Sequence, residues 1–276
     1  MPGQSRNIGD IDVTPVSDGV LTTSLDVVLG LDKSEAERLS GKKIGDPVPI
    51  AVNAFLLKLR DKLVLVDAGS GNTMGPTLGK LPENLRTLGV APEQIDVVLL
   101  THLHPDHSNG LVDDNGQAIY PNAEVVLHAK EASFWLDRDP ASGASERIRR
   151  NIAKSAVTTK PYRTRMRTVG EGEVLPGISA LALPGHTPGH TGWLIESGKE
   201  ALLIWGDLVH LAAVQVARPD TGLVFDVDPQ VACATRRHMF DRVAADRLKV
   251  AGAHLDFHGF GTIVRTGPEF RFEPDV

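Results

Sequence analysis

The chain has 276 residues, a formal net charge of −6 and a single cysteine, Cys233. One cysteine excludes an internal disulfide, and no stretch approaches the roughly 18–20 apolar residues that a membrane-spanning helix needs. Residues 1–10 are polar and lack the apolar core of a signal peptide, so we expect a cytoplasmic protein. This length suits one large α/β domain with a substantial core.

Apolar runs and turn residues predict an alternation of strands and helices along the chain. We expect strands at residues 11–16, 51–59, 62–67, 95–100, 124–128, 178–183, 201–207 and 250–254. Helices are expected at residues 34–40, 82–88, 130–137 and 228–248. Strands in two groups with helices between them suit two sheets packed face to face with helices outside. Residues 1–49 would form a first strand and a lid or dimer segment, and residues 50–265 the catalytic core.

The run Thr101-His102-Leu103-His104-Pro105-Asp106-His107 directly follows the apolar stretch 95–100. Side chains alternate along a strand, so a strand end delivers His102 and His104 to the same side. The turn opened by Pro105 can bring Asp106 and His107 to a neighbouring point. Such a cluster would be costly to bury without a ligand, so it predicts a two-metal site for zinc, iron, manganese or cobalt.

Further candidate ligands close later apolar runs. His186 lies in a Gly/Pro-rich turn, Asp207 ends the strand 201–207 in a Gly-Asp pair, and His254 ends the last short strand. Strand ends that converge on one edge of a sheet would gather all seven side chains, because functional residues are commonly carried by loops at the rim of a rigid sheet.

The order His-x-His-x-Asp-His, then Gly-His, Gly-Asp and a late His resembles the metallo-β-lactamase-fold superfamily. The resemblance covers residues 50–265 and implies a four-layer αββα sandwich. It also implies a first metal on His102, His104 and His186, and a second on Asp106, His107 and His254. Asp207 would bridge the two metals together with a water or hydroxide.

Shorter segments are similar to the methyl parathion hydrolase branch, which includes lactone- and aryl-ester-hydrolysing enzymes. They are residues 75–79, 105–107, 132–136, 212–215 and 252–255. This likeness places Trp135 at the mouth of the substrate pocket. Phe134 is a further candidate for the pocket wall, but the two residues are adjacent on a helix and face different directions, so one of them is expected in the core. Residues 25–29 and 208–214 are further candidate walls, mostly apolar.

Several other residues are candidates for supporting roles. Asp67 ends a strand and would hold a ligating imidazole, the alternative being a turn-forming aspartate. Thr187 is a second candidate for a position behind the metal ligands, and His190 is expected to brace its turn. His210 lies where related lactonases place a tyrosine, and it would polarise the substrate carbonyl or act behind the ligands. His258, four residues after His254, is a candidate for the pocket.

Residues 138–167 hold nine basic and two acidic residues, a local charge of +7. They could form an anion- or nucleic-acid-binding patch, but aromatic residues are almost absent from the segment. We favour an exposed helix and strand that cover the site and contact an acidic neighbour. No placed cation is expected near the metals, because Arg and Lys are absent from the motif loops.

These observations predict a dinuclear hydrolase that attacks lactones or aryl esters with a metal-bridging hydroxide, with organophosphate triesters as further substrates. We expect two divalent ions, zinc first, a small-molecule substrate, a homodimer, and no nucleic-acid or membrane partner. Asp106 would carry a proton to the leaving group. The alternatives are a phosphodiesterase or nuclease of the same fold, and an iron- or metal-binding protein without hydrolytic turnover.

Overall fold

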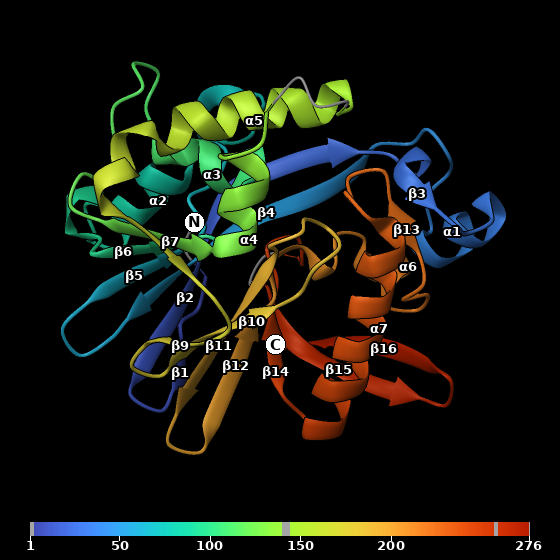
Figure 1. Cartoon of the computed structure of the whole chain (residues 1–276). Coiled ribbons are helices and arrows are strands. Elements are labelled where there is room, and N and C mark those ends of the chain that lie inside the picture. Colours follow the sequence, from blue (N-terminus) through green and yellow to red (C-terminus); the bar gives the residue numbers. More distant parts are fainter. Residues whose placement is uncertain (1–2, 140–143, 257–258, 276) are drawn as a thin grey trace.

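Two seven-stranded β-sheets pack face to face, and helices cover their outer faces (Figure 1). The structure is a computed structural model and describes residues 3–139, 144–256 and 259–275. The four-layer αββα sandwich predicted from the sequence is confirmed. In the described part of the chain, no helix combines the length and the apolar character needed to cross a bilayer.

The first sheet has the order β1-β2-β4-β5-β6-β7-β8. Its strands are β1 (Arg6–Ile8), β2 (Ile11–Thr23), β4 (Val48–Lys58), β5 (Leu63–Val66), β6 (Val97–Leu99), β7 (Glu124–His128) and β8 (Met166–Val169). Strands β5 to β8 pair in parallel, and the others pair antiparallel. Parallel strands end at the same edge of the sheet, which is where ligands bind in open α/β sheets.

The second sheet has the order β16-β15-β14-β12-β11-β10-β9. Its strands are β9 (Gly172–Leu175), β10 (Ile178–Ala182), β11 (Thr191–Ser197), β12 (Glu200–Ile204), β14 (Lys249–Ala251), β15 (Phe260–Thr266) and β16 (Glu269–Pro274). Only β12 and β14 pair in parallel among these described strands. A separate two-stranded sheet joins β3 (Val28–Leu29) to β13 (Gly222–Leu223).

The α-helices are α1 (Lys33–Ser40), α2 (Leu81–Thr87), α3 (Pro105–Ser108), α4 (Ala129–Trp135), α5 (Glu146–Thr159), α6 (Ala212–Gln215) and α7 (Pro229–Asp246). Short 3-10 helices are η1 (Leu25–Val27), η2 (Gly71–Thr73), η3 (Pro92–Gln94), η4 (Asn109–Leu111), η5 (Lys160–Arg165) and η6 (Gly206–Leu208). Helices α2, α4 and α5 cover the first sheet and α7 covers the second.

Both faces of the central strands are buried, which explains why they read as continuous apolar runs. In β4, Leu56 packs toward α2, α4 and α5, whereas its neighbours Phe55 and Leu57 pack against the second sheet. In β12, Leu203 packs under α7, and Leu202 and Ile204 face the first sheet. This alternation holds the two sheets rigidly together below the edge that carries the candidate ligands.

Strand β2 is much longer than the predicted strand 11–16 and extends to Thr23. The register of this strand shifts between Ser17 and Gly19. Gly19 adopts φ +135°, and a Cβ there would lie 1.9 Å from Thr77 O, so glycine is required. The irregularity buries the carboxylate of Asp18, which accepts hydrogen bonds from Ser70, Gly79 and Leu81.

The basic segment 138–167 forms α5, η5 and β8. Arg149, Arg150 and Lys154 of α5 are exposed, and Arg167 of β8 pairs with Glu124 at 2.8 Å. Helix α5 packs on α3 and α4. The structure therefore agrees with an exposed helix and strand beside an acidic neighbour, with the exception of Arg147, which lines the pocket described below.

Candidate metal centre

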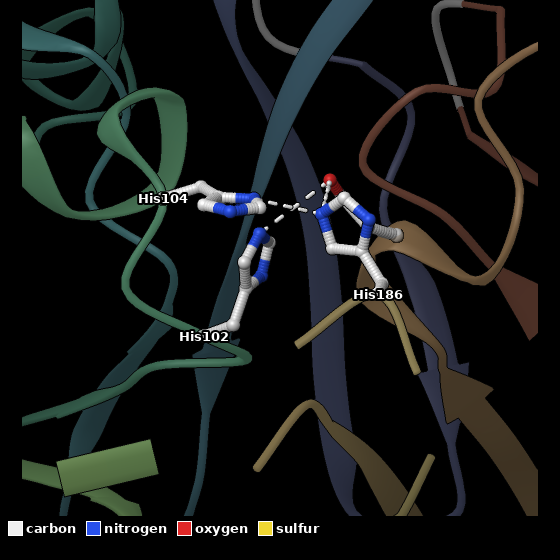
Figure 2. Close-up of side chains that lie close together, drawn as sticks. His102, His104 and His186 are labelled. Carbon is white, nitrogen blue, oxygen red and sulfur yellow. Dashed lines mark hydrogen bonds and ion pairs between the residues drawn. The ribbon is translucent and has the colours of Figure 1, made fainter. Parts of the chain in front are cut away.

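The motif His-x-His-x-Asp-His crosses from the end of β6 into helix α3. After Leu99, two residues lead to His102, and His104 occupies the N-cap position of α3, which carries Asp106 and His107. Pro105 at the first helical position starts this short helix at once. The imidazoles of His102 and His104 point toward one another, and His186 faces them from the other sheet (Figure 2).

Three further side chains come from the second sheet. His186 lies in the turn between β10 and β11, Asp207 lies in η6 directly after β12, and His254 follows β14. Gly185 holds the first turn against α7: its φ is +126°, and a Cβ there would lie 2.1 Å from Ala232 N. At this edge of the sandwich, each of the two sheets therefore contributes part of the cluster.

A first group contains His102, His104, His186 and Asp207, whose ligand atoms all lie within 4.8 Å of one another. His104 Nδ1 is 2.8 Å from His186 Nε2. Asp207 Oδ2 lies 3.1 Å from His186 Nε2 and 3.5 Å from His102 Nε2. All four side chains are buried.

A second group contains Asp106, His107, His254 and again Asp207. His107 Nε2 lies 3.1 Å from Asp207 Oδ1 and 3.5 Å from Asp106 Oδ2. His254 Nε2 lies 3.2 Å from Asp207 Oδ1 and 3.5 Å from Asp106 Oδ2. The structure therefore brings all seven predicted side chains together in the two predicted sets, with Asp207 common to both.

The atoms that face the centre of this cluster fit two divalent metal ions. Among the described residues, His102 Nε2, His107 Nε2 and Asp207 Oδ1 are buried without a hydrogen-bond partner. Buried polar atoms without partners are costly, and imidazole nitrogens with carboxylate oxygens are the donors that zinc and similar metals take.

The electrostatics of the cluster favour positive charge at the same point. Burial would raise the pKa of Asp207, but His107, His254 and His210 hold it well below its usual range. Burial lowers the pKa of His102 and His104, which keeps both imidazoles neutral, as metal binding requires. Burial also opposes protonation of His107, yet Asp207, Asp106 and Asp67 raise its pKa well above normal. The carboxylates of Asp106 and Asp207 thus favour a cation at the centre of the cluster.

The ring nitrogens that face away from the cluster are held by hydrogen bonds. Asp67 Oδ2 lies 2.8 Å from His107 Nδ1, and its other oxygen accepts from Thr101 N. His254 Nδ1 lies 2.8 Å from Ala51 O, and His186 Nδ1 lies 2.9 Å from Asp226 Oδ1. Such contacts fix the orientation of a ligating imidazole. Asp67 takes the position predicted for it, whereas Asp226 carries no sequence signal that distinguishes it from a turn residue.

His190 braces its turn as predicted. Its Nδ1 donates to Leu183 O at 2.8 Å, and its Nε2 accepts from Asp207 N at 3.0 Å. Burial lowers the pKa of His190 to about 3, so the ring is neutral and can make both contacts. It thereby positions the backbone of Asp207 rather than joining either group.

Sequence reasoning missed Glu131 of α4, a fully buried carboxylate behind the cluster. Its Oε1 accepts from Leu103 N at 2.8 Å and from Trp135 Nε1 at 2.7 Å. Its Oε2 accepts from Thr187 Oγ1 at 2.6 Å and from Gly189 N at 3.1 Å. Burial raises the pKa of Glu131, and these four hydrogen bonds oppose that rise. Thr187 therefore lies behind the cluster and donates to Glu131.

A pocket of about 330 Å³ opens over the two groups. It is lined by Leu21, Thr22, Thr23, Ile50, Met74, His104, Pro105, Asp106, Arg147, Asn151, His186, Asp207, His210, Phe225 and His254. The walls come from the end of β2, the start of β4, the loop before α2, and α5. Of the predicted walls 25–29 and 208–214, only His210 contributes.

The prediction that Trp135 lies at the pocket mouth is wrong, and Phe134 does not line this pocket either; Trp135 is the one of the two that lies in the core. The indole N–H of Trp135 donates to Glu131 one turn earlier, which draws the ring into the core behind His104. Phe134 lines a separate surface groove with Lys130 and Pro188, and the guanidinium of Arg138 lies over its ring. His258 lies outside the described residues.

His210 lies in the pocket beside Asp207. Its Nε2 is 3.0 Å from Asp207 Oδ2, and its ring stacks on that of His254 with 4.8 Å between centroids. Its Nδ1 is buried without a partner in the described chain. Burial lowers the pKa of His210 to about 4, so the ring is neutral.

Residues 47–251 match the metallo-beta-lactamase superfamily. A solved hydrolase, AbOPH, in the beta lactamase superfamily is 31% identical, covers 99% of this chain and 97% of its own, and superposes with a TM-score of 0.91. AidC, a dizinc quorum-quenching lactonase solved with its product, is 24% identical with 99% and 97% coverage and a TM-score of 0.92, a likeness of fold.

Two curated relatives are N-acyl homoserine lactonases. The Bacillus cereus protein is 26% identical over 179 residues, which is 58% of this chain and 64% of the relative. AiiB of Agrobacterium fabrum is 29% identical over 174 residues, 55% and 60% respectively. The matched part thus spans about three fifths of these relatives. With the family match over most of the chain and a 31% identical full-length structural relative, the chain belongs to the metallo-beta-lactamase superfamily.

Proposed function

We propose that this protein is a dinuclear metal-dependent hydrolase of lactones or aryl esters. The observation that carries the proposal is Asp207, a buried carboxylate shared by two His/Asp groups at the base of a pocket. Relatives named as N-acyl homoserine lactonases and as a hydrolase support the same class of reaction.

In this proposal, His102, His104 and His186 hold the first metal ion. Asp106, His107 and His254 hold the second, and Asp207 binds both. Zinc is the expected metal, with cobalt, manganese or iron as alternatives, because the donor set contains only imidazole nitrogen and carboxylate oxygen. When bound, two such ions lower the pKa of water toward about 7 and withdraw charge from the substrate carbonyl oxygen.

The chain's own polar groups would complete the reaction. His210 lines the pocket beside Asp207, and the single N–H of its neutral ring would donate to the substrate carbonyl oxygen in place of Asp207 Oδ2. Asp106 also faces the pocket, and His107 and His254 counter the effect of burial and hold its pKa below its usual range. An ionised Asp106 can thus accept the proton of the attacking water and pass it to the leaving alkoxide or phenoxide.

The upper walls favour a neutral, partly apolar substrate. Leu21, Ile50, Met74 and Phe225 surround the opening above the cluster. Burial of apolar substrate atoms against such side chains contributes roughly 25 cal/mol per Å². A lactone with an acyl chain or an aryl ester can bury its apolar atoms against these side chains. A neutral phosphotriester is proposed as a further substrate.

We also propose that the protein is a homodimer.

The test is hydrolysis by protein reconstituted with Zn²⁺ or Co²⁺, against a chelated control. The panel comprises dihydrocoumarin, N-hexanoyl homoserine lactone, p-nitrophenyl acetate, methyl parathion, bis-p-nitrophenyl phosphate and a β-lactam. Metal-dependent turnover of the lactones or the aryl ester supports the proposal. Turnover confined to bis-p-nitrophenyl phosphate would establish the phosphodiesterase alternative, and two bound metals without any turnover would refute the substrate class.

A further inference from the structure

Arg147 is the feature of the pocket that the hydrolytic mechanism does not use. It lies at the start of α5 and reaches the turn after β13, where Nη1 donates to Phe225 O at 2.7 Å and Nη2 to Asp226 O at 3.4 Å. A guanidinium has five N–H donors, so three are left over. Its side chain also lines the pocket, which makes it a cation in the wall above the metal groups.

No carboxylate neutralises this cation by direct contact. Within the described chain, no Asp or Glu oxygen lies within 4.0 Å of the Arg147 nitrogens, and its two acceptors are neutral carbonyls. The carboxylate of Asp226, whose charge acts on Arg147, already bonds to His186 Nδ1 and Leu223 N. A partly buried cation with spare donors binds an oxygen acceptor strongly, because the contact is charge-assisted.

Asn151 adds a second donor on the same face of α5. Residues four apart on a helix are neighbours, and both side chains line the same pocket. Within the described chain, the carboxamide of Asn151 makes no hydrogen bond. The same pocket is also lined by the apolar side chains of Leu21, Ile50 and Met74. A substrate that displaced water from this wall without supplying an acceptor would leave both groups unpaired, at a cost in free energy.

We infer that Arg147 and Asn151 form a subsite that binds an oxygen acceptor of the substrate remote from the scissile ester. This rests on the proposed function and deepens it: the preferred substrates are esters or lactones that carry a second carbonyl or a carboxylate. An acylamino carbonyl is the neutral form of this acceptor, and a carboxylate is the charged form.

Arg147 could instead act only as a brace. It holds the turn that contains Asp226, and Asp226 holds the imidazole of His186. A brace would act through metal binding and would affect every substrate alike. A subsite would change selectivity while the metal content stayed constant. The two roles are therefore separable by measurement.

The experiment compares Arg147→Met and Asn151→Ala with Arg150→Met. Arg150 is an exposed arginine on the same helix, so its variant removes the same charge outside the pocket. One substrate pair is N-hexanoyl homoserine lactone and α-heptyl-γ-butyrolactone, which carry chains of equal length at the same ring carbon and differ in the acylamino group. The other pair is 4-acetoxybenzoate and phenyl acetate, which differ in the carboxylate. Metal content is measured for every variant.

For each pair, the selectivity is the kcat/KM of the acceptor-bearing member divided by the kcat/KM of its partner. We expect this selectivity to fall about tenfold or more in Arg147→Met for at least one pair. Asn151→Ala should lower the same ratio less, and Arg150→Met should leave it unchanged. A fall in the first pair alone identifies the neutral acceptor, and a fall in the second alone identifies the charged one. Equal losses for both members of each pair, a loss of metal, or unchanged ratios in both pairs would overturn the inference.

Calorimetric binding separates this inference from the proposed function. The probes are N-hexanoyl-L-homoserine and 2-(2-hydroxyethyl)nonanoate, two ring-opened hydroxy acids that differ in the acylamino group, together with benzoate and benzyl alcohol, which differ in the carboxylate. If wild-type protein hydrolyses none of the substrates, the proposed function fails. Weaker binding of an acceptor-bearing probe alone in Arg147→Met would then still establish the subsite, and unchanged binding of all four would overturn it.

Discussion

Asp207 and Glu131 are both buried carboxylates close to the pocket, yet they meet opposite kinds of partner. The oxygens of Asp207 face imidazole nitrogens, and one of them has no hydrogen bond in the described chain. Each oxygen of Glu131 accepts two hydrogen bonds. A buried carboxylate whose donors are all in place stabilises the fold, whereas one that lacks them indicates a place for a cation.

Replacement of Asp207 should have the largest effect. In Asp207→Asn, both groups lose their shared anionic oxygen, so we expect less than one bound metal and a loss of kcat/KM on the order of a thousandfold. Metal analysis and kinetics on the same preparations measure this. The control is Asp220→Asn, an exposed aspartate of the same half of the chain. Full activity with two metals bound would refute the role of Asp207.

Removal of the metal ions should lower the stability of the folded protein, and this effect should depend on Asp207. A metal that binds only the folded state at a free concentration 100 times its Kd stabilises that state by about 2.7 kcal/mol. Chelation should therefore lower the Tm of wild-type protein, and added Zn²⁺ should restore it. The Tm of Asp207→Asn should respond much less to both treatments. Thermal unfolding that is equal with and without metal in wild type would contradict the two-metal site.

Glu131→Gln tests the second carboxylate of this comparison, whose hydrogen bonds are expected to stabilise the fold. A carboxamide offers one acceptor oxygen, and its NH₂ would face backbone and side-chain donors, so we expect a loss of about 1–3 kcal/mol in the free energy of unfolding. Metal content should stay near that of wild type. Denaturant unfolding against Glu93→Gln, an exposed glutamate, measures the difference. An unchanged free energy of unfolding would show that the four contacts do not stabilise the fold.

Thr187→Val should give the smallest effect. It removes one of the four donors to Glu131 and keeps the shape of the side chain, so we expect a loss of about 1 kcal/mol. The double variant with Glu131→Gln should lose less than the sum of the two single changes, because both act on one contact. Strict additivity would indicate that Thr187 stabilises its turn independently of Glu131.

The sequence predicted the site best where the signal was local. His102, His104, Asp106 and His107 lie within six positions, and Asp67, His186, Asp207 and His254 each follow an apolar run. Strand geometry alone brings such residues to one edge, so their convergence follows from the pattern. The four layers follow in the same way from two groups of strands separated by helices.

The pocket walls were not predictable by the same reasoning. The rotation of α4 about its axis is set by Glu131, whose donors at residues 103, 187 and 189 lie outside the helix, and Trp135 bonds to the same carboxylate from within the helix. The donors outside the helix are remote in sequence and are backbone groups or a hydroxyl, which leave no motif. Arg147 also escaped prediction, since nothing in a run of basic residues marks the one that turns toward the pocket.

The division of the chain between the sheets has a consequence for fragment complementation. Residues 6–169 supply every strand of the first sheet and residues 172–274 every strand of the second, and the connection at Gly170 and Glu171 is exposed. A chain cut there would carry four proposed ligands on one fragment and three on the other, so neither fragment alone would hold a complete group. Divalent metal would then act as a reversible cross-link between the two pieces, and their reassembly would report metal concentration.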